Sequence, residues 1–161
     1  MTLFEALTVA KQQIDRLDAR LLLQYATGCS HTDLLARPET TVIAPAYAQF
    51  SEWVARRAAG EPLAYLVGEA EFRGRVFQVS PAVLIPRPET EVLIDLALEK
   101  LRDIANPKVL ELGTGSGIIA ISLALECPAV QIVTVDVSKD AIFFARNNAG
   151  RLAAKVDCRE G

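Results

Sequence analysis

Residues 109–117 read Val-Leu-Glu-Leu-Gly-Thr-Gly-Ser-Gly, and residues 133–136 read Val-Thr-Val-Asp. This pattern predicts an apolar strand, a tight turn, a helix and then a second apolar strand that ends on a carboxylate. In a parallel sheet, the backbone N–H groups of the turn and the side chain of Asp136 would meet at one edge. That arrangement holds a nucleoside-bearing cofactor.

The glycine turn, residues 113–117, has the spacing G-x-G-x-G. Glycine permits positive φ angles and lets a ligand approach the backbone closely. The dinucleotide pattern G-x-G-x-x-G/A would place Gly or Ala at position 118, where this chain has Ile118, and no P-loop Gly-Lys-Ser/Thr follows. The turn therefore favours the looser glycine motif of methyltransferases over NAD or FAD binding.

Two carboxylates flank this motif. Glu111 lies two residues before the first glycine, where its charge would oppose a pyrophosphate but suit a cationic ligand such as the amino group of S-adenosylmethionine. Asp136 ends the second strand and can accept hydrogen bonds from both ribose hydroxyls. The alternatives are that Glu111 only caps the turn and that Asp136 forms an Asx-turn into the next helix.

Composition restricts the class of protein. The 161 residues are 51% hydrophobic and 23% charged, which indicates a globular chain with a core. The net charge of −3 disfavours a direct nucleic-acid partner. Three scattered cysteines suit a reducing cytoplasm, and the longest apolar run, 118–125, is far shorter than the ~20 residues that span a bilayer. We expect a cytoplasmic protein with no metal and no membrane partner.

Hydrophobic spacing divides the chain into three parts. Residues 1–68 have helical periodicity, 69–87 predict a β-hairpin followed by a proline-rich linker, and 88–161 alternate strand and helix. The expected fold class is α + α/β: a small helical domain, a short hairpin linker and an incomplete Rossmann-like domain. In that domain the strand 109–112 has the composition of a strand buried on both faces. A sheet with two complete strands and part of a third would leave apolar surface and an edge uncovered.

Two helices have predicted buried faces that the structure can test. The first, near the N-terminus, is expected to bury Leu17, Leu21, Leu22 and Tyr25, and the second, after Pro88, to bury Leu93, Leu96, Ala97 and Leu101.

Basic residues cluster in the middle of the chain, with acidic residues interleaved. The basic ones are Arg56, Arg57, Arg73, Arg75 and Arg87, and the acidic ones are Glu61, Glu69, Glu71 and Glu89. Either a solvated mixed-charge surface or a partner-binding patch fits this pattern.

Three stretches together resemble one family. Residues 57–74 (RAAGEPLAYLVGEAEFRG) are similar to the inter-domain signature of the release-factor glutamine methyltransferases. Residues 84–91 (LIPRPETE) are similar to the entry into that family's catalytic domain, and 111–117 (ELGTGSG) to its cofactor motif. The resemblance covers essentially the whole chain, and the proline-rich stretch is its most specific part.

The resemblance implies methyl transfer from S-adenosylmethionine to the side-chain amide of the glutamine in the Gly-Gly-Gln motif of peptide chain release factors. It implies that the helical domain helps to dock the release factor, and that the full-length protein is a monomer. The implied cofactor-binding residues are Glu111, Gly113, Thr114, Gly115, Ser116, Gly117 and Asp136. Pro86–Thr90 would lie near the cofactor, with Arg87 either there or in an ion pair.

One family motif does not occur in these residues. Asn-Pro-Pro-Tyr, which orients the amide nitrogen, has no counterpart, because Asn106-Pro107 is followed by Lys108. We therefore assign no catalytic residue and expect a catalytically incomplete N-terminal portion of such an enzyme. The alternatives are a non-catalytic module that binds release factor or cofactor, a nucleic-acid methyltransferase and an NAD-dependent oxidoreductase.

Overall fold

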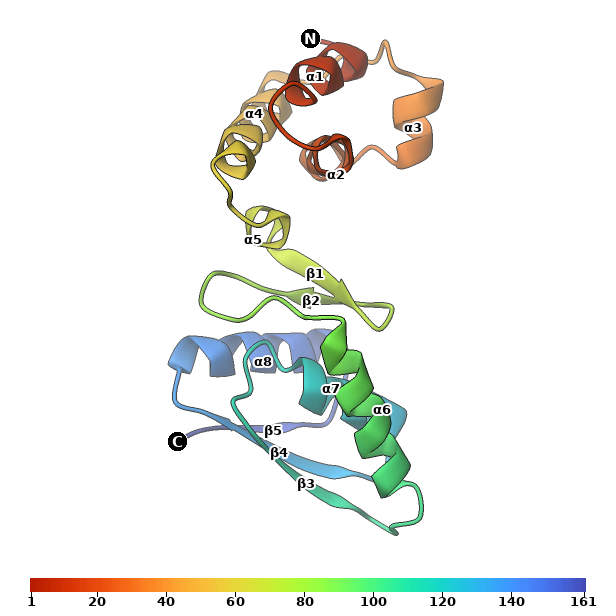
Figure 1. The fold of residues 1–161 in the computed structure, drawn as a ribbon, viewed down its shortest axis with the longest axis vertical. Helices are drawn as coiled ribbons and strands as arrows, with labels where there is room; N and C mark the ends of the chain where they lie inside the picture. Colours follow the sequence, from red (N-terminus) through yellow and green to blue (C-terminus); the bar gives the residue numbers. More distant parts are fainter. The chain divides into compact units, whose positions relative to one another are not determined.

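The computed structural model describes residues 1–161, which divide into the units Met1–Val67 and Gly68–Gly161 (Figure 1). The first unit is helical, as expected. Its elements are α1 (Leu3–Ala10), α2 (Arg16–Thr27), α3 (His31–Ala36), α4 (Ala44–Ala58) and α5 (Leu63–Val67).

Polar caps and one glycine set the ends of these short helices. Thr2 and Glu5 form a reciprocal capping box on α1, and Ser30 forms the same motif with Asp33 on α3. Gly28 ends α2 in the left-handed conformation, with φ of 71°. These local signals fix where the helices start and stop, and their shared core then holds them together. That core includes Leu3, Leu22, Leu23, Phe50, Val54 and Leu66.

The second unit combines a hairpin with a parallel sheet. Its elements are β1 (Glu69–Phe72), β2 (Arg75–Gln78), α6 (Glu89–Leu101), β3 (Lys108–Leu112), α7 (Ile118–Glu126), β4 (Gln131–Asp136), α8 (Lys139–Arg151) and β5 (Asp157–Glu160). β1 and β2 are antiparallel, whereas β3, β4 and β5 form a parallel sheet in that order. This is the expected Rossmann-like arrangement, in which successive right-handed crossovers carry helices to one side.

The hairpin packs within the second unit. Phe72 and Phe77 are buried in the same core as Ile94 of α6 and Ile121 of α7. The tight turn at Arg73-Gly74 has positive φ angles of 49° and 69°, as a two-residue hairpin turn requires. Residues 69–79 therefore share a core with the α/β elements, while the chain from Pro81 to Pro88 connects β2 to α6 without a regular element of its own.

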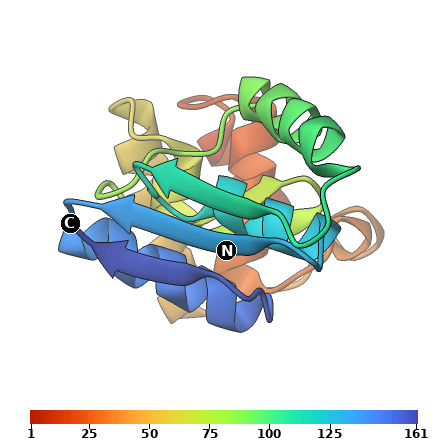
Figure 2. The same cartoon turned by 90° about the horizontal axis from the view of Figure 1, so that it is seen from below.

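Helices cover only one face of the parallel sheet. α7 and α8 both pack on the face that carries Ile132 and Thr134, and the opposite face is open in Figure 2. Leu110 and Leu112 point to that open face and are 63% and 77% exposed. The expectation that strand 109–112 is buried on both faces is thus wrong, whereas the expected uncovered apolar surface is present.

The predicted buried faces of two helices are wrong in part: Leu22 is buried as expected and Ala97 and Leu101 pack against the core, but other predicted residues are exposed. In α2 the buried residues are Ala19, Leu22 and Leu23, and in α6 the buried residue is Ile94. Leu17, Tyr25, Leu93 and Leu96 are instead each about half exposed. Both helices carry apolar residues around much of their circumference, so spacing alone did not identify the face that packs. No helix of the structure has both the length and the apolar character to cross a membrane.

Candidate functional site

The glycine turn follows β3 directly and adopts a conformation that only glycine takes easily. Gly113, Gly115 and Gly117 have φ angles of 84°, 54° and 84°, in the left-handed region that L side chains avoid. The N–H of Gly113 donates to the carbonyl oxygen of Val135 at 2.8 Å. The turn is thereby attached to the neighbouring strand β4 where both strands end.

Asp136 joins the turn to the next helix. Its Oδ2 accepts a hydrogen bond from the N–H of Gly115 at 3.0 Å, and its Oδ1 accepts one from the N–H of Ser138 at 2.9 Å. The second bond is the Asx-turn that the sequence left as an alternative. Each carboxylate oxygen has a second lone pair, so these two bonds leave acceptor capacity for a ligand hydroxyl.

The space around the three glycines differs in a way that separates their roles. A Cβ atom at Gly113 or Gly115 would meet no atom within 4 Å. A Cβ at Gly117 would lie 2.9 Å from Cδ1 of Ile121 and 3.2 Å from the Cα of Ala145. Gly117 therefore allows α7 and α8 to approach each other, whereas Gly113 and Gly115 border open space that a ligand can occupy.

Thr114 and Ser116 face inward. Both residues are only 3% exposed. The Thr114 hydroxyl lies 2.5 Å from that of Thr134, which is fully buried on β4, and Thr134 donates to Oε2 of Glu111 at 2.7 Å. The expected site residues thus lie together, with the side chains of Thr114 and Ser116 buried.

Glu111 is the acid at the end of this buried chain of hydrogen bonds. Its pKa is raised from 4.5 to about 7, chiefly by burial and to a smaller extent by the negative charge of Asp136. Hydrogen bonds from Thr134 and from the backbone of Ala120 act in the opposite direction. A carboxyl whose pKa lies near neutrality gains most from a cationic ligand, because the ligand's charge favours the ionised form.

Asn148 is a buried residue of the site that the sequence analysis did not identify. Its Nδ2 donates to the carbonyl oxygen of Ser116 at 2.9 Å and to that of Gln78 at 3.0 Å, and its Oδ1 accepts from the N–H of Gln78 at 2.7 Å. It shares a helix face with the buried Ala141 and Ala145. A polar residue on an otherwise apolar face was the signal that could have found it.

At this edge of the sheet, two glycines border open space, the carboxylate of Asp136 has spare acceptor capacity, and Glu111 is a half-buried acid with a raised pKa. The set suits a ligand that has hydroxyl groups and a cationic end.

Two family models match separate parts of the chain. Residues 3–68 match the family model of the PrmC N-terminal domain, and residues 90–161 match that of the methyltransferase small domain.

Curated relatives match over the whole chain. The release factor glutamine methyltransferase of Bordetella pertussis is 46% identical and aligns with 100% of this chain and 59% of its own length. The enzymes of the same name from Koribacter versatilis and Vibrio cholerae are 44% and 41% identical, over 99% and 95% of this chain and 59% and 56% of theirs. The chain thus spans somewhat more than half the length of these relatives. Among solved structures, coclaurine N-methyltransferase overlaps 88% of this chain and 48% of its own at a TM-score of 0.43 and 15% identity.

The glycine contacts lead to a stability prediction. Gly117→Ala should lower the free energy of unfolding by about 2–4 kcal/mol, since it adds a backbone clash to the cost of a positive φ. Gly115→Ala meets open space and should cost only about 1–2 kcal/mol. Urea unfolding of the two variants measures the difference, and equal losses would contradict the role given to Gly117.

A second prediction concerns the buried amide. Asn148→Ala leaves the N–H and C=O of Gln78 and the C=O of Ser116 without this partner, and should lower the free energy of unfolding by about 2–4 kcal/mol. The adjacent Asn147 is half-buried and makes no side-chain hydrogen bond, so Asn147→Ala is the matched control. Similar urea midpoints for the two variants would refute the bridging role.

Proposed function

We propose that this chain, which is similar along its whole length to release factor glutamine methyltransferases, binds S-adenosylmethionine at the glycine turn and serves methylation of release factors. The acceptor is the side-chain amide of the glutamine in their Gly-Gly-Gln motif. The similarity to these enzymes supports S-adenosylmethionine-dependent methylation in general. That the methyl acceptor is this glutamine is our proposal.

One observation carries the cofactor assignment: Gly115 and Asp136 share a hydrogen bond at the edge of the sheet, beside space that is open at Gly113 and Gly115. We assign the methionine part of the cofactor to the turn 113–117 and the ribose hydroxyls to Asp136. A Cβ at either of the two open glycines would intrude on this space, so the residues present fit the group. Bound S-adenosylmethionine supplies an electrophilic methyl group on a positively charged sulfur.

Glu111 supports a cationic rather than an anionic ligand. Two carboxylates, Glu111 and Asp136, lie close enough for the charge of one to raise the pKa of the other. A pyrophosphate would add negative charge to this pair, whereas the amino group of S-adenosylmethionine would relieve it. This sign argument also disfavours a nicotinamide dinucleotide.

The parts of the chain receive different roles in this proposal. Residues 1–68 would dock the release factor, 69–87 would connect, and 88–161 would bind the cofactor. Residues 1–161 contain no Asn-Pro-Pro-Tyr, and an amide nitrogen is a weak nucleophile that depends on positioning. We therefore assign binding roles to these residues and no catalytic role. The proposed partner is a release factor, which places the chain in the cytoplasm with neither a nucleic acid nor a membrane as its direct partner.

Calorimetry tests the cofactor assignment. The chain should bind S-adenosylmethionine, and Asp136→Asn should weaken that binding by about 10–100-fold, because charge-assisted hydrogen bonds to the turn and the ribose are lost. Asp103→Asn removes an exposed carboxylate in the loop before β3 and is the control. Binding of NAD in place of S-adenosylmethionine would overturn the assignment.

The same preparation distinguishes binding from turnover. Supplied with a bacterial class 1 release factor and cofactor labelled in the methyl group, residues 1–161 should leave the factor unlabelled. Robust labelling would show that they contain the catalytic group. Release-factor binding without any cofactor binding would instead favour a docking module.

The raised pKa of Glu111 predicts a pH dependence. Above about pH 7 the carboxylate is ionised and attracts the cationic cofactor, and below that pH it is protonated and does not. Affinity should therefore fall by up to about tenfold between about pH 8 and pH 6. Glu111→Gln should remove most of that fall, whereas Glu99→Gln, which changes an exposed residue of α6, should retain it. A pH profile unaffected by Glu111→Gln would contradict the role of this group.

A further inference from the structure

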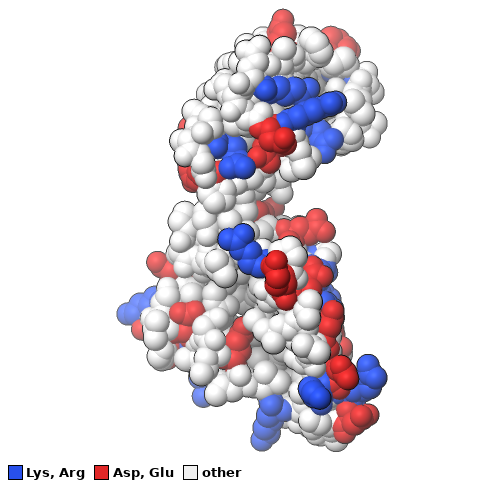
Figure 3. Space-filling view, in the orientation of Figure 1, with Lys and Arg blue, Asp and Glu red and all other residues white.

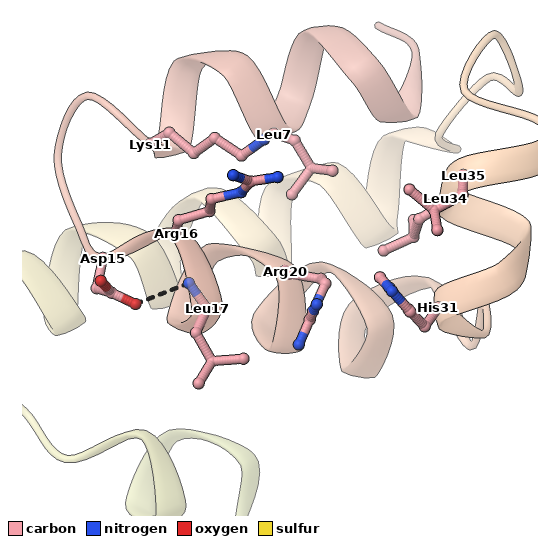
Figure 4. A pocket seen from close by; sticks show the side chains of 9 residues that line it. All are labelled: Leu7, Lys11, Asp15, Arg16, Leu17, Arg20, His31, Leu34 and Leu35. Carbon is pink, nitrogen blue, oxygen red and sulfur yellow. Dashed lines mark hydrogen bonds between the residues drawn. The ribbon is translucent and has the colours of Figure 1, made fainter.

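The helical unit contains a cavity of about 350 Å³ that none of the roles above uses. It is lined by Leu7 of α1, by Lys11 just after that helix, and by residues at the start of α2 and in α3 (Figure 4). In this view the side chains of Lys11 and Arg16 lie next to each other between α1 and α2, and those of Arg20 and His31 lie nearer to α3.

The charges around this cavity are unbalanced. Lys11, Arg16 and Arg20 line it together with a single acid, Asp15, whose Oδ1 already accepts the N–H of Leu17 at 2.7 Å. None of the three cations forms an ion pair. By contrast, the helix α4 cations Arg56 and Arg57 bond to Glu61 and Asp18. A chain of net charge −3 thus concentrates unpaired positive charge at one site, and Figure 3 shows basic side chains gathered over α1 and α2.

Arg20 adds an unsatisfied donor. Its Nε atom is buried and has no hydrogen-bond partner. A buried N–H without an acceptor costs free energy that a carboxylate arriving from outside would recover. The guanidinium presents its donors in a planar fork that matches the two oxygens of a carboxylate.

The rim of the cavity is apolar. Leu17 is 50% exposed and Leu35 is 70% exposed, and both line the same cavity. A free anion would make no use of these leucines, whereas a peptide that carries an apolar residue beside an acidic one would cover them. Three cations without an aromatic residue also make a poor track for nucleic acid.

We propose that this cavity is a docking site for an acidic protein segment, with a Glu or Asp carboxylate on Arg16, Arg20 and Lys11 and a neighbouring apolar side chain on Leu17 and Leu35. For its natural partner the inference rests on the proposed function, which makes a release factor the protein substrate. The chemistry of the cavity itself can be tested without that partner.

Two blocked tetrapeptides test the chemistry: acetyl-Leu-Glu-Glu-Leu-amide and its uncharged analogue acetyl-Leu-Gln-Gln-Leu-amide. The acidic peptide should shift the NMR methyl signals of Leu17 and Leu35, and the uncharged one should bind at least about tenfold more weakly. Absence of shifts with the acidic peptide would overturn the proposal. Equal shifts with sodium acetate alone would also overturn it, because the site would then recognise only a small anion.

Variants test the same surface against the whole partner. Lys11→Glu combined with Arg16→Glu should weaken binding of a class 1 release factor by at least about tenfold and reduce its salt dependence. Arg37→Glu changes an exposed arginine of the same unit that does not line the cavity, and should change affinity less than about twofold. Urea midpoints close to that of the unmodified chain establish that the variants fold.

The outcomes separate the two proposals. If the acidic peptide binds in the cavity but no release factor does, the docking chemistry stands and the proposed partner is wrong. If release factor binds equally well to the unmodified chain and to the double variant, the cavity is not its docking site, whatever the cofactor measurements give.

Discussion

The buried carboxamide of Asn148 connects three segments that are far apart in sequence. It bonds to both backbone groups of Gln78 in the hairpin and to the carbonyl oxygen of Ser116 in the glycine turn, while its own backbone belongs to α8. The turn has three positive φ angles, which persist only where surrounding contacts hold them. A single satisfied amide therefore joins the hairpin, the turn and the helix, in addition to the apolar core that the hairpin and the helix share.

A group of ion pairs holds the other end of the hairpin. Arg73 and Arg75 both bond to Glu126 at the end of α7, and Arg73 also reaches Asp95 of α6. The two arginines lower the pKa of Glu126. Arg73 and Arg75 are therefore paired within the unit, with Glu126 and Asp95 rather than with the acids interleaved in the basic cluster. The pairs with Glu126 are partly buried, whereas Asp95 is exposed, and the pairs with Glu126 connect the hairpin to α7 beside a shared apolar core.

Whether a feature could be predicted depends on how far apart in sequence its interacting residues are. The helical segments of residues 1–68 and the hairpin within 69–87 depend on interactions between residues a few positions apart, so they could be predicted from the sequence. Which side of α2 or α6 becomes buried depends on partners many residues distant. Leu17 and Leu93 were therefore assigned to the core, although Leu23 and Ile94, which were not predicted to be buried, occupy it.

From the sequence alone came the glycine turn, the carboxylate of Asp136, the order of strands and helices, and the resemblance to a methyltransferase family. These depend on backbone chemistry, residue spacing and motif. Only the tertiary structure decided that Glu111 is buried enough to titrate near neutrality, that Asn148 joins the turn to the hairpin, and that Arg20 has an unpaired donor in a basic cavity. Burial and hydrogen-bond partners are properties of the packed chain, because each depends on atoms that the local sequence does not specify.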